Sequence, residues 1–171
     1  MLSNVQKELN RFAKYVVSQS KANLTRGKKK SSRRLYDSID YDLNVSPNSF
    51  SLKFFMEEYG KFQDKGVSGT RKKYNTPYSY KDKMPPSKKL DKWLVKRNLK
   101  GIRNEKGQFI SRKSLSYVIA RSVFIKGIKP SLFFTKPFEK AFKDLPQDIV
   151  KAYALDVEEL IKFTTNGNNK R

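Results

Sequence analysis

The sequence predicts an α+β fold, in which a small antiparallel β-sheet is packed by an N-terminal and a C-terminal helix. Near both ends of the chain, apolar residues recur at three- and four-residue steps, which is the period of an amphipathic helix. Between them, two short segments alternate apolar and polar residues, as half-buried strands do. Strands and helices do not alternate along the chain as parallel βαβ units require, so the sheet is expected to be antiparallel.

The N-terminal helix is predicted over residues 3–23, because Val5, Leu9, Phe12 and Val16 share one face. The following segment, 25–34, contains six basic residues, no acidic residue and one glycine. Adjacent like charges beside a glycine disfavour regular structure, so a mobile basic loop is expected here. The basic residues of this loop are Arg26, Lys28, Lys29, Lys30, Arg33 and Arg34.

A β-hairpin is predicted next. Residues 39–45 carry apolar side chains at every second position, and residues 50–56 do the same. The intervening Ser46-Pro47-Asn48-Ser49 is typical of a turn. The two runs therefore form antiparallel strands whose apolar faces are aligned.

The middle of the chain is predicted to be rich in loops. Tyr59 and Phe62 suggest a short helical turn before a glycine-containing loop at 64–70. A basic, proline-containing insertion covers about 71–110, and a helix is expected to begin inside it after Pro86. In that helix we expect Ser87 as the N-cap, with three apolar residues on the inner face. These are Leu90, Trp93 and Leu94.

Ser111 is predicted to cap a further helix, with Leu115, Val118, Ile119 and Val123 in its buried stripe. Gly127-Ile128-Lys129-Pro130 ends that helix, since glycine suits the position after a helix and proline cannot continue one. The apolar run 132–134 is a candidate third strand.

The C-terminal part is predicted to contain one more helical turn and a last helix. We expect a core built from both terminal helices on one face of the hairpin. Its residues would be Leu9, Phe12, Phe54, Val157 and Leu160. The chain is interpreted as a single domain over 1–163, followed by a flexible tail at 164–171.

Charge is the strongest functional signal. The chain has 38 Lys and Arg against 16 Asp and Glu, a formal +22, with neither His nor Cys. Without these two residue types there is no Ser-His triad, no Cys nucleophile and no His or Cys ligand for zinc. We therefore expect neither an enzyme nor a cofactor. So large an excess of positive charge indicates a polyanionic partner.

The positive charge outside the 25–34 loop gathers in the middle of the sequence. Residues 61–103 contain fourteen Lys or Arg and three Asp. We expect DNA or a partner to contact Arg71, Lys72 and Lys73 there, and also the six basic residues of the 25–34 loop. Three tyrosines interleaved with these charges could stack on bases. They are Tyr74, Tyr78 and Tyr80.

One acidic group supports an alternative enzyme hypothesis. Asp37, Asp40 and Asp42 could bind a divalent metal for phosphodiester cleavage. Asp40 and Asp42, however, lie on the strand face that is opposite Ile39 and Tyr41, and this polar face is expected to face solvent.

The apolar runs are too short to span a membrane, and the N-terminus lacks a signal-peptide pattern, so a cytosolic product is expected.

Two segments carry a resemblance to a known family. Met56 to Thr70, which includes Tyr59-Gly60, follows a hairpin and an amphipathic helix. Gly127 to Phe134 then precedes Pro137-Phe138 and a terminal helix. This order resembles the neck and tail-completion proteins of tailed bacteriophages. The insertion at about 71–110 is longer than that family's pattern.

The resemblance implies a subunit of a homo-oligomeric ring between the portal and the tail, with double-stranded DNA passing through. It implies portal or adaptor and tail proteins as partners, and a location in the virion, with assembly in the host cytoplasm. Residues expected to contact a neighbouring subunit are Tyr59, Phe62, Trp93, Phe133 and Phe134. The second hypothesis is a sequence-independent nucleic-acid-binding protein, and the third is the metal-dependent nuclease.

Overall fold

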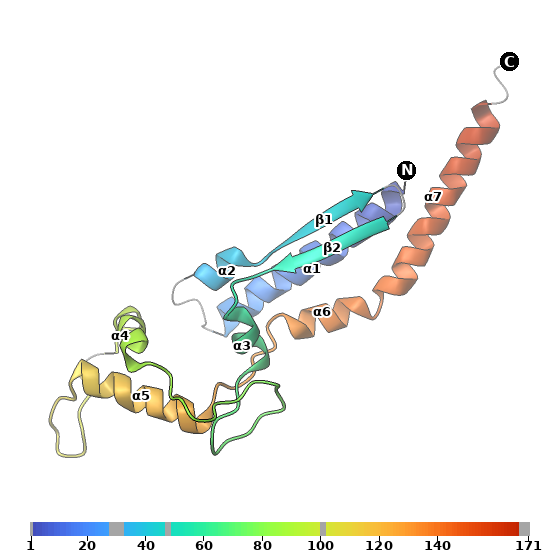
Figure 1. Cartoon of the computed structure of the whole chain (residues 1–171). Helices are drawn as coiled ribbons and strands as arrows, with labels where there is room; N and C mark the ends of the chain where they lie inside the picture. Colours follow the sequence, from blue (N-terminus) through green and yellow to red (C-terminus); the bar gives the residue numbers. More distant parts are fainter. Residues whose placement is uncertain (1, 28–32, 47–48, 100–101, 168–171) are drawn as a thin grey trace. The chain divides into compact units, whose positions relative to one another are not determined.

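The structure is a computed structural model that describes residues 2–27, 33–46, 49–99 and 102–167 (Figure 1). The described helices and strands are, in chain order, α1 (Ser3–Arg26), α2 (Arg34–Ser38), β1 (Asp40–Ser46), β2 (Ser49–Phe55), α3 (Gly60–Lys65), α4 (Ser87–Lys96), α5 (Arg112–Lys126), α6 (Thr135–Phe142) and α7 (Leu145–Gly167). The α+β class predicted from the sequence is confirmed, with the hairpin packed against α1 and α6.

The chain forms two compact units. Unit 1 comprises Met1–Asn23, Ser38–Met56 and Phe133–Arg171, and unit 2 comprises Leu24–Asp37 and Glu57–Leu132. Unit 1 thus contains the hairpin with most of α1 and all of α6 and α7, whereas unit 2 contains α3, α4 and α5. The interpretation of 1–163 as a single domain stays a prediction.

The hairpin was predicted correctly. β1 and β2 pair antiparallel, with Tyr41 opposite Phe54 and Leu43 opposite Leu52, so the apolar side chains share one face. The candidate third strand at 132–134 is wrong, because the sheet in the described chain has two strands. Leu132 adopts a positive φ of 49°, which is incompatible with a strand, and α6 begins at Thr135.

An aromatic cluster joins α1, β2 and α6 in unit 1. The ring of Phe54 lies 6.2 Å from that of Phe12, 5.4 Å from that of Phe134 and 6.0 Å from that of Phe138, all edge to face. Phe12 and Phe138 are 5.6 Å apart. Such pairs contribute about 0.5–1.5 kcal/mol beyond the area that they bury. This cluster therefore fixes both helices to the inner face of the hairpin.

The expected contribution of α7 to the core is partly wrong. Leu160 is 61% exposed, and the buried residues of this helix include Ala152 and Asp156 instead. α7 is tied to the start of α1 by the Asp156 carboxylate, which accepts hydrogen bonds from the backbone amides of Asn4 (2.9 Å) and Val5 (3.1 Å). α7 also runs through Gly167, and residues 168–171 lie outside the described chain.

Unit 2 is organised around α5. Ser111 caps this helix as predicted, since its Oγ accepts the amide of Ser114 at 3.1 Å. Two expectations about side chains are wrong. The N-cap of α4 is Pro86, with Ser87 as the first helical residue. Val118 is exposed, because the inner stripe of α5 passes through Leu115, Ser116 and Ala120.

Candidate nucleic-acid interface

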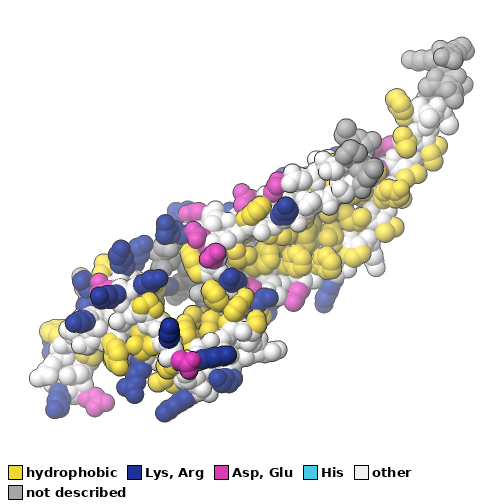
Figure 2. Space-filling model, in the orientation of Figure 1, with side chains coloured by type: hydrophobic (Ala, Val, Ile, Leu, Met, Phe, Trp, Pro, Cys, Tyr) yellow, Lys and Arg dark blue, Asp and Glu magenta, His cyan; other side chains and the backbone are white. Residues whose placement is uncertain are grey.

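The positive charge of the chain is concentrated in one of its units. Unit 2 has 26 Lys and Arg against 7 Asp and Glu, a net charge of +19, whereas unit 1 has 12 against 9, a net charge of +3. On the face shown in Figure 2, many Lys and Arg side chains lie around α4, α5 and the neighbouring loops, interspersed with other side chains. Unit 2 is therefore the part of the molecule that would attract a polyanion.

A close backbone contact holds the loops of unit 2 in place. Val67 and Ile128 form a two-way bridge, with N–H to O distances of 2.9 and 2.7 Å. A Cβ on Gly127 would lie 2.2 Å from the Val67 carbonyl oxygen, and one on Gly69 would lie 2.2 Å from that of Ile125. Only glycine fits both positions. The two sequence segments that carry the family resemblance thus pair with each other.

The basic run 71–73 is anchored on this framework. The backbone amide of Arg71 donates to the Ile125 carbonyl at 3.1 Å, and Lys73 Nζ donates to the Gly69 carbonyl at 3.0 Å. Lys72 Nζ lies 5.6 Å from the centre of the Tyr74 ring. All three basic side chains are exposed. A fixed backbone with exposed cations suits contact with phosphates at constant spacing.

The predicted loop at 25–34 is shorter in the structure. Thr25 and Arg26 belong to α1, and Arg34 begins α2, so three positions assigned to the loop are helical. Arg33 forms a long ion pair with Asp37 at 3.8 Å. Residues 28–30, the three lysines predicted to face DNA or a partner, fall outside the described residues.

The three tyrosines of the basic insertion are engaged within unit 2. Tyr78 packs on Phe62 with ring centres 4.7 Å apart, and Tyr80 packs on Phe124 at 6.2 Å. Burial raises the pKa of the Tyr80 hydroxyl. Phe62 and Tyr78 line a hollow of about 660 Å³, together with Tyr80, Tyr59 and Pro77. Base stacking by the three tyrosines stays a prediction, and two of them, Tyr78 and Tyr80, face this hollow.

The carboxylates proposed for a nuclease lie at the surface. Asp40 accepts from the amide of Tyr41 at 2.9 Å, and Asp42 accepts from the side chain of Asn44 at 2.9 Å. Both are exposed. Within the described ranges, there is no group of three or more His, Cys, Asp or Glu side chains that could hold a metal ion. These hydrogen bonds account for both aspartates as polar residues of a solvent face.

The expected subunit contacts differ in accessibility. Tyr59 is exposed, and Phe62 and Trp93 are half-buried, so each presents some surface. Phe133 is 2% exposed and belongs to the core of unit 1, where its carbonyl accepts from Asn23. It therefore has no side-chain surface to offer, and this expectation is wrong. Phe134 packs mainly within the aromatic cluster.

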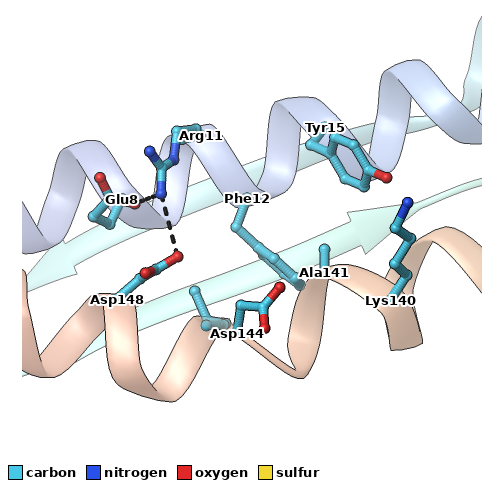
Figure 3. Close-up of a pocket in the computed structure, with 9 residues that line it drawn as sticks. Glu8, Arg11, Phe12, Tyr15, Lys140, Ala141, Asp144 and Asp148 are labelled. Atoms are coloured by element: carbon cyan, nitrogen blue, oxygen red, sulfur yellow. Dashed lines mark hydrogen bonds and ion pairs between the residues drawn. The ribbon is translucent and has the colours of Figure 1, made fainter.

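A second hollow, of about 390 Å³, lies in unit 1 between α1, the end of α6 and the start of α7 (Figure 3). Arg11 crosses its rim and pairs with Glu8 at 2.7 Å and with Asp148 at 3.2 Å. Lys140 and Asp144 also line it. Because three acidic and two basic side chains line this hollow, it offers no net attraction for a nucleic acid.

No family model, curated protein or solved structure matches the chain. None of the helices in the described chain has the length and apolar character needed to cross a membrane.

The sequence identified the basic segments but did not predict that they all belong to unit 2. Counting charge over 24–37 and 57–132 would have revealed the asymmetry, but only once those two segments were known to belong together.

Proposed function

We propose that the chain is a non-catalytic structural subunit of the head-to-tail connector of a tailed bacteriophage. In this proposal it forms a ring between portal and tail, and unit 2 contacts the backbone of double-stranded DNA without reading its sequence. One observation carries the proposal, namely the net charge of +19 on unit 2 against +3 on unit 1.

The charge pattern supports contact with DNA because each cation placed on a phosphate releases a counterion, whatever the base sequence. The exposed run Arg71 to Lys73, fixed by hydrogen bonds to Ile125 and Gly69, provides such cations on a rigid support. A protein that holds DNA while letting it pass needs contacts of this kind, since base-specific contacts would fix the position of the duplex.

The phage setting is supported by the order of elements and by the pairing of residues 66–70 with residues 127–130. These two segments carry the resemblance, and they are adjacent through the Val67–Ile128 bridge although about sixty residues separate them in the sequence. Location of the gene beside capsid, portal or terminase genes would be the most direct independent support for this setting.

The binding of DNA can be tested with two charge-matched double variants. Arg71→Gln with Lys72→Gln removes two exposed cations from unit 2, and Lys7→Gln with Lys14→Gln removes two from unit 1. Affinity for a duplex of random sequence would be measured between 50 and 200 mM salt. In the first variant we expect the slope of log K against log salt to fall by about 0.9 for each phosphate that the protein no longer neutralises. In the second variant the slope should stay unchanged.

Equal slopes for the two variants would show that binding follows overall charge, and would overturn the assignment to unit 2. Strong preference for one DNA sequence would also contradict the proposal. The triple variant Lys28→Ala, Lys29→Ala, Lys30→Ala extends the test to the basic loop. It should lower the slope further and leave the melting temperature nearly unchanged, because the sequence predicts a solvated loop at these positions and charges in such a loop contribute little to stability.

The second candidate function is a sequence-independent nucleic-acid-binding protein that acts as a monomer or dimer. The same charge partition favours it, since that observation concerns the contact with DNA and not the assembly of the protein. The two functions differ in oligomeric state and in the presence of the protein in virions. Absence of the protein from purified particles of its phage would favour the second.

A further inference from the structure

The outer face of α7 carries an apolar stripe in which four residues are exposed and one, Val157, is half-buried. Val150, Tyr153, Val157 and Leu160 recur at steps of three, four and three residues, with Ile161 beside the last. We call these five residues the α7 seam. Figure 2 shows hydrophobic side chains along this helix. Alternating steps of three and four residues are the spacing with which one helix packs along another.

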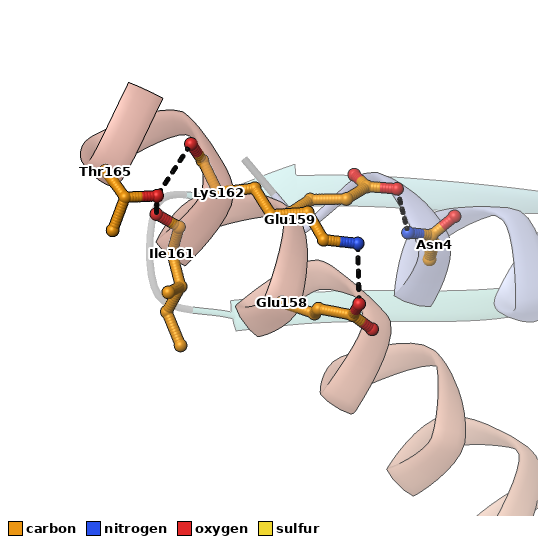
Figure 4. A network of polar contacts seen from close by, with 6 residues as sticks. All are labelled: Asn4, Glu158, Glu159, Ile161, Lys162 and Thr165. Carbon is orange, nitrogen blue, oxygen red and sulfur yellow. Dashed lines mark hydrogen bonds and ion pairs between the residues drawn. The ribbon is translucent and has the colours of Figure 1, made fainter. Parts of the chain in front are cut away.

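The seam is separate from the face that α7 uses within unit 1. Asp156 and Ala152 are the buried residues of the helix, and Asp156 is bound to the amides of Asn4 and Val5. In Figure 4 the side chain of Ile161 projects away from Asn4. α7 thus has one side that packs in its own subunit and a second, apolar one that faces outward.

Polar side chains near the end of the seam form contacts within the subunit. Lys162 Nζ lies 2.6 Å from Glu158 Oε1, and Glu159 accepts from Asn4 at 3.2 Å (Figure 4). Residues 145–163 contain four acidic and two basic residues, in a chain whose net charge is +22. The helix is therefore one of the few regions of this chain that another strongly basic molecule can approach without repulsion.

We propose that the α7 seam is the surface through which this chain associates with a second copy of itself. Charge favours unit 1 as the part through which two copies meet, because a contact through unit 2 would bring together two units of net charge +19, whereas unit 1 carries +3. The expectation that copies of the chain assemble comes from the proposed function. The present inference adds that they assemble through the α7 seam.

The seam supplies only part of the area that a specific contact requires. A standard interface takes about 800 Å² from each partner. An aromatic side chain supplies roughly 150–250 Å² of that when fully exposed, and Tyr153 is 53% exposed. With Leu160 at 61% and Ile161 at 57%, the seam provides the apolar centre of such an interface, and the acidic and amide side chains beside it provide the polar rim.

The chain offers a matched pair of variants for the test. Leu160→Ser with Ile161→Ser removes two adjacent exposed apolar residues of α7. Tyr117→Ser with Val118→Ser removes a comparable pair from α5, since these residues are 52% and 56% exposed. Neither change touches a buried side chain, so both variants should fold, which circular dichroism would verify.

Association would be measured by sedimentation velocity up to about 1 mM protein, in 0.15 M and in 0.5 M salt. The Debye length is about 8 Å at the lower salt concentration and shorter at the higher one. We expect the wild type to sediment above its 19.9 kDa monomer mass, and more so in high salt, because screening weakens repulsion between the basic units. The α7 variant should need at least about tenfold more protein for the same degree of association, and the α5 variant should behave as wild type.

A wild type that stays monomeric at the highest concentration and salt would overturn the proposal, as would equal weakening by the two variants. Association that weakens in high salt would also overturn it, because an electrostatic contact would then be responsible. The DNA-binding slope of the α7 variant should remain that of the wild-type monomer. Absence of a salt-dependent slope in wild type and variant alike would instead count against the proposed function.

Discussion

Asp156 provides the sharpest test of how unit 1 is held together. Its carboxylate accepts four hydrogen bonds from the first turn of α1: from the amides of Asn4 and Val5, from the Asn4 side chain at 3.0 Å and from Ser3 Oγ at 3.5 Å. It therefore caps the N-terminus of a helix that lies 152 residues away in the sequence. A negative charge there also interacts favourably with the helix dipole.

The magnitude follows from these contacts. Replacing a capping side chain by Ala costs about 0.5–2 kcal/mol, and the loss of a hydrogen bond to a charged group costs about 1.5–3 kcal/mol. These ranges overlap, because both describe the same amides. Val5 is buried, so water cannot fully replace the missing acceptor. We expect Asp156→Ala to lower the free energy of unfolding by about 2–4 kcal/mol.

The pH dependence has a definite sign. Burial by itself would raise the pKa of the Asp156 carboxyl, but the amides of Asn4 and Val5 and the side chains of Asn4 and Ser3 lower it, and the net shift is downward. A depressed pKa gives stability that is present above the ordinary value of about 3.9 and is lost as the pH falls through the lower folded-state value. The stability difference between wild type and Asp156→Asn should therefore persist down to about pH 4 and shrink below it.

Urea unfolding at pH 7, pH 4 and pH 2.5 would measure this effect. Asp148→Asn is the matched control on the same helix, because Asp148 makes a more exposed ion pair with Arg11 and should contribute less than about 1 kcal/mol. If Asp156→Ala cost no more than this control, or if its effect were constant over the whole pH range, the capping argument would be refuted.

Three further changes test other parts of the structure. Phe54→Ala should cost about 3 kcal/mol in urea melts, the lower end of the range for a large core residue since the ring is half-buried, and a loss below about 1 kcal/mol would contradict the aromatic cluster. Gly127→Ala should cost about 1–3 kcal/mol more than Gly107→Ala, because both residues have φ near +75° but only Gly127 faces backbone within 4 Å. Asp40→Asn with Asp42→Asn should change neither stability nor DNA binding, and Mg²⁺-dependent DNA cleavage abolished by this pair would favour the nuclease hypothesis.

The elements that the sequence predicts well are those with a local signal. The two-residue period indicated the hairpin and the alignment of its apolar faces, and Ser111 and Gly127 marked the two ends of α5. The run 132–134 failed because a short apolar run does not distinguish a strand from the approach to a helix. In the structure the chain turns at Leu132 and continues into α6.

Features that depend on distant residues could not be predicted in the same way. Nothing near Asp156 in the sequence indicates that it caps α1, and nothing near Gly69 indicates that Gly127 lies against it. Periodicity likewise showed that α7 is amphipathic but not which of its apolar residues are covered. Leu160 fits the helical pattern of a core residue and yet is exposed, because α1 packs along a neighbouring face of α7.

The two proposed contacts should respond to salt concentration in opposite directions. Contact between unit 2 and DNA gains from released counterions, so it weakens as salt increases. Association through the α7 seam is apolar and is opposed by repulsion between units of +19, so it strengthens as salt increases. DNA neutralises the same charge that salt screens. Bound duplex should therefore lower the protein concentration needed for association at 0.15 M salt, and it should do so for the wild type and not for Leu160→Ser with Ile161→Ser. A basic subunit of this design would therefore assemble more readily where DNA is bound.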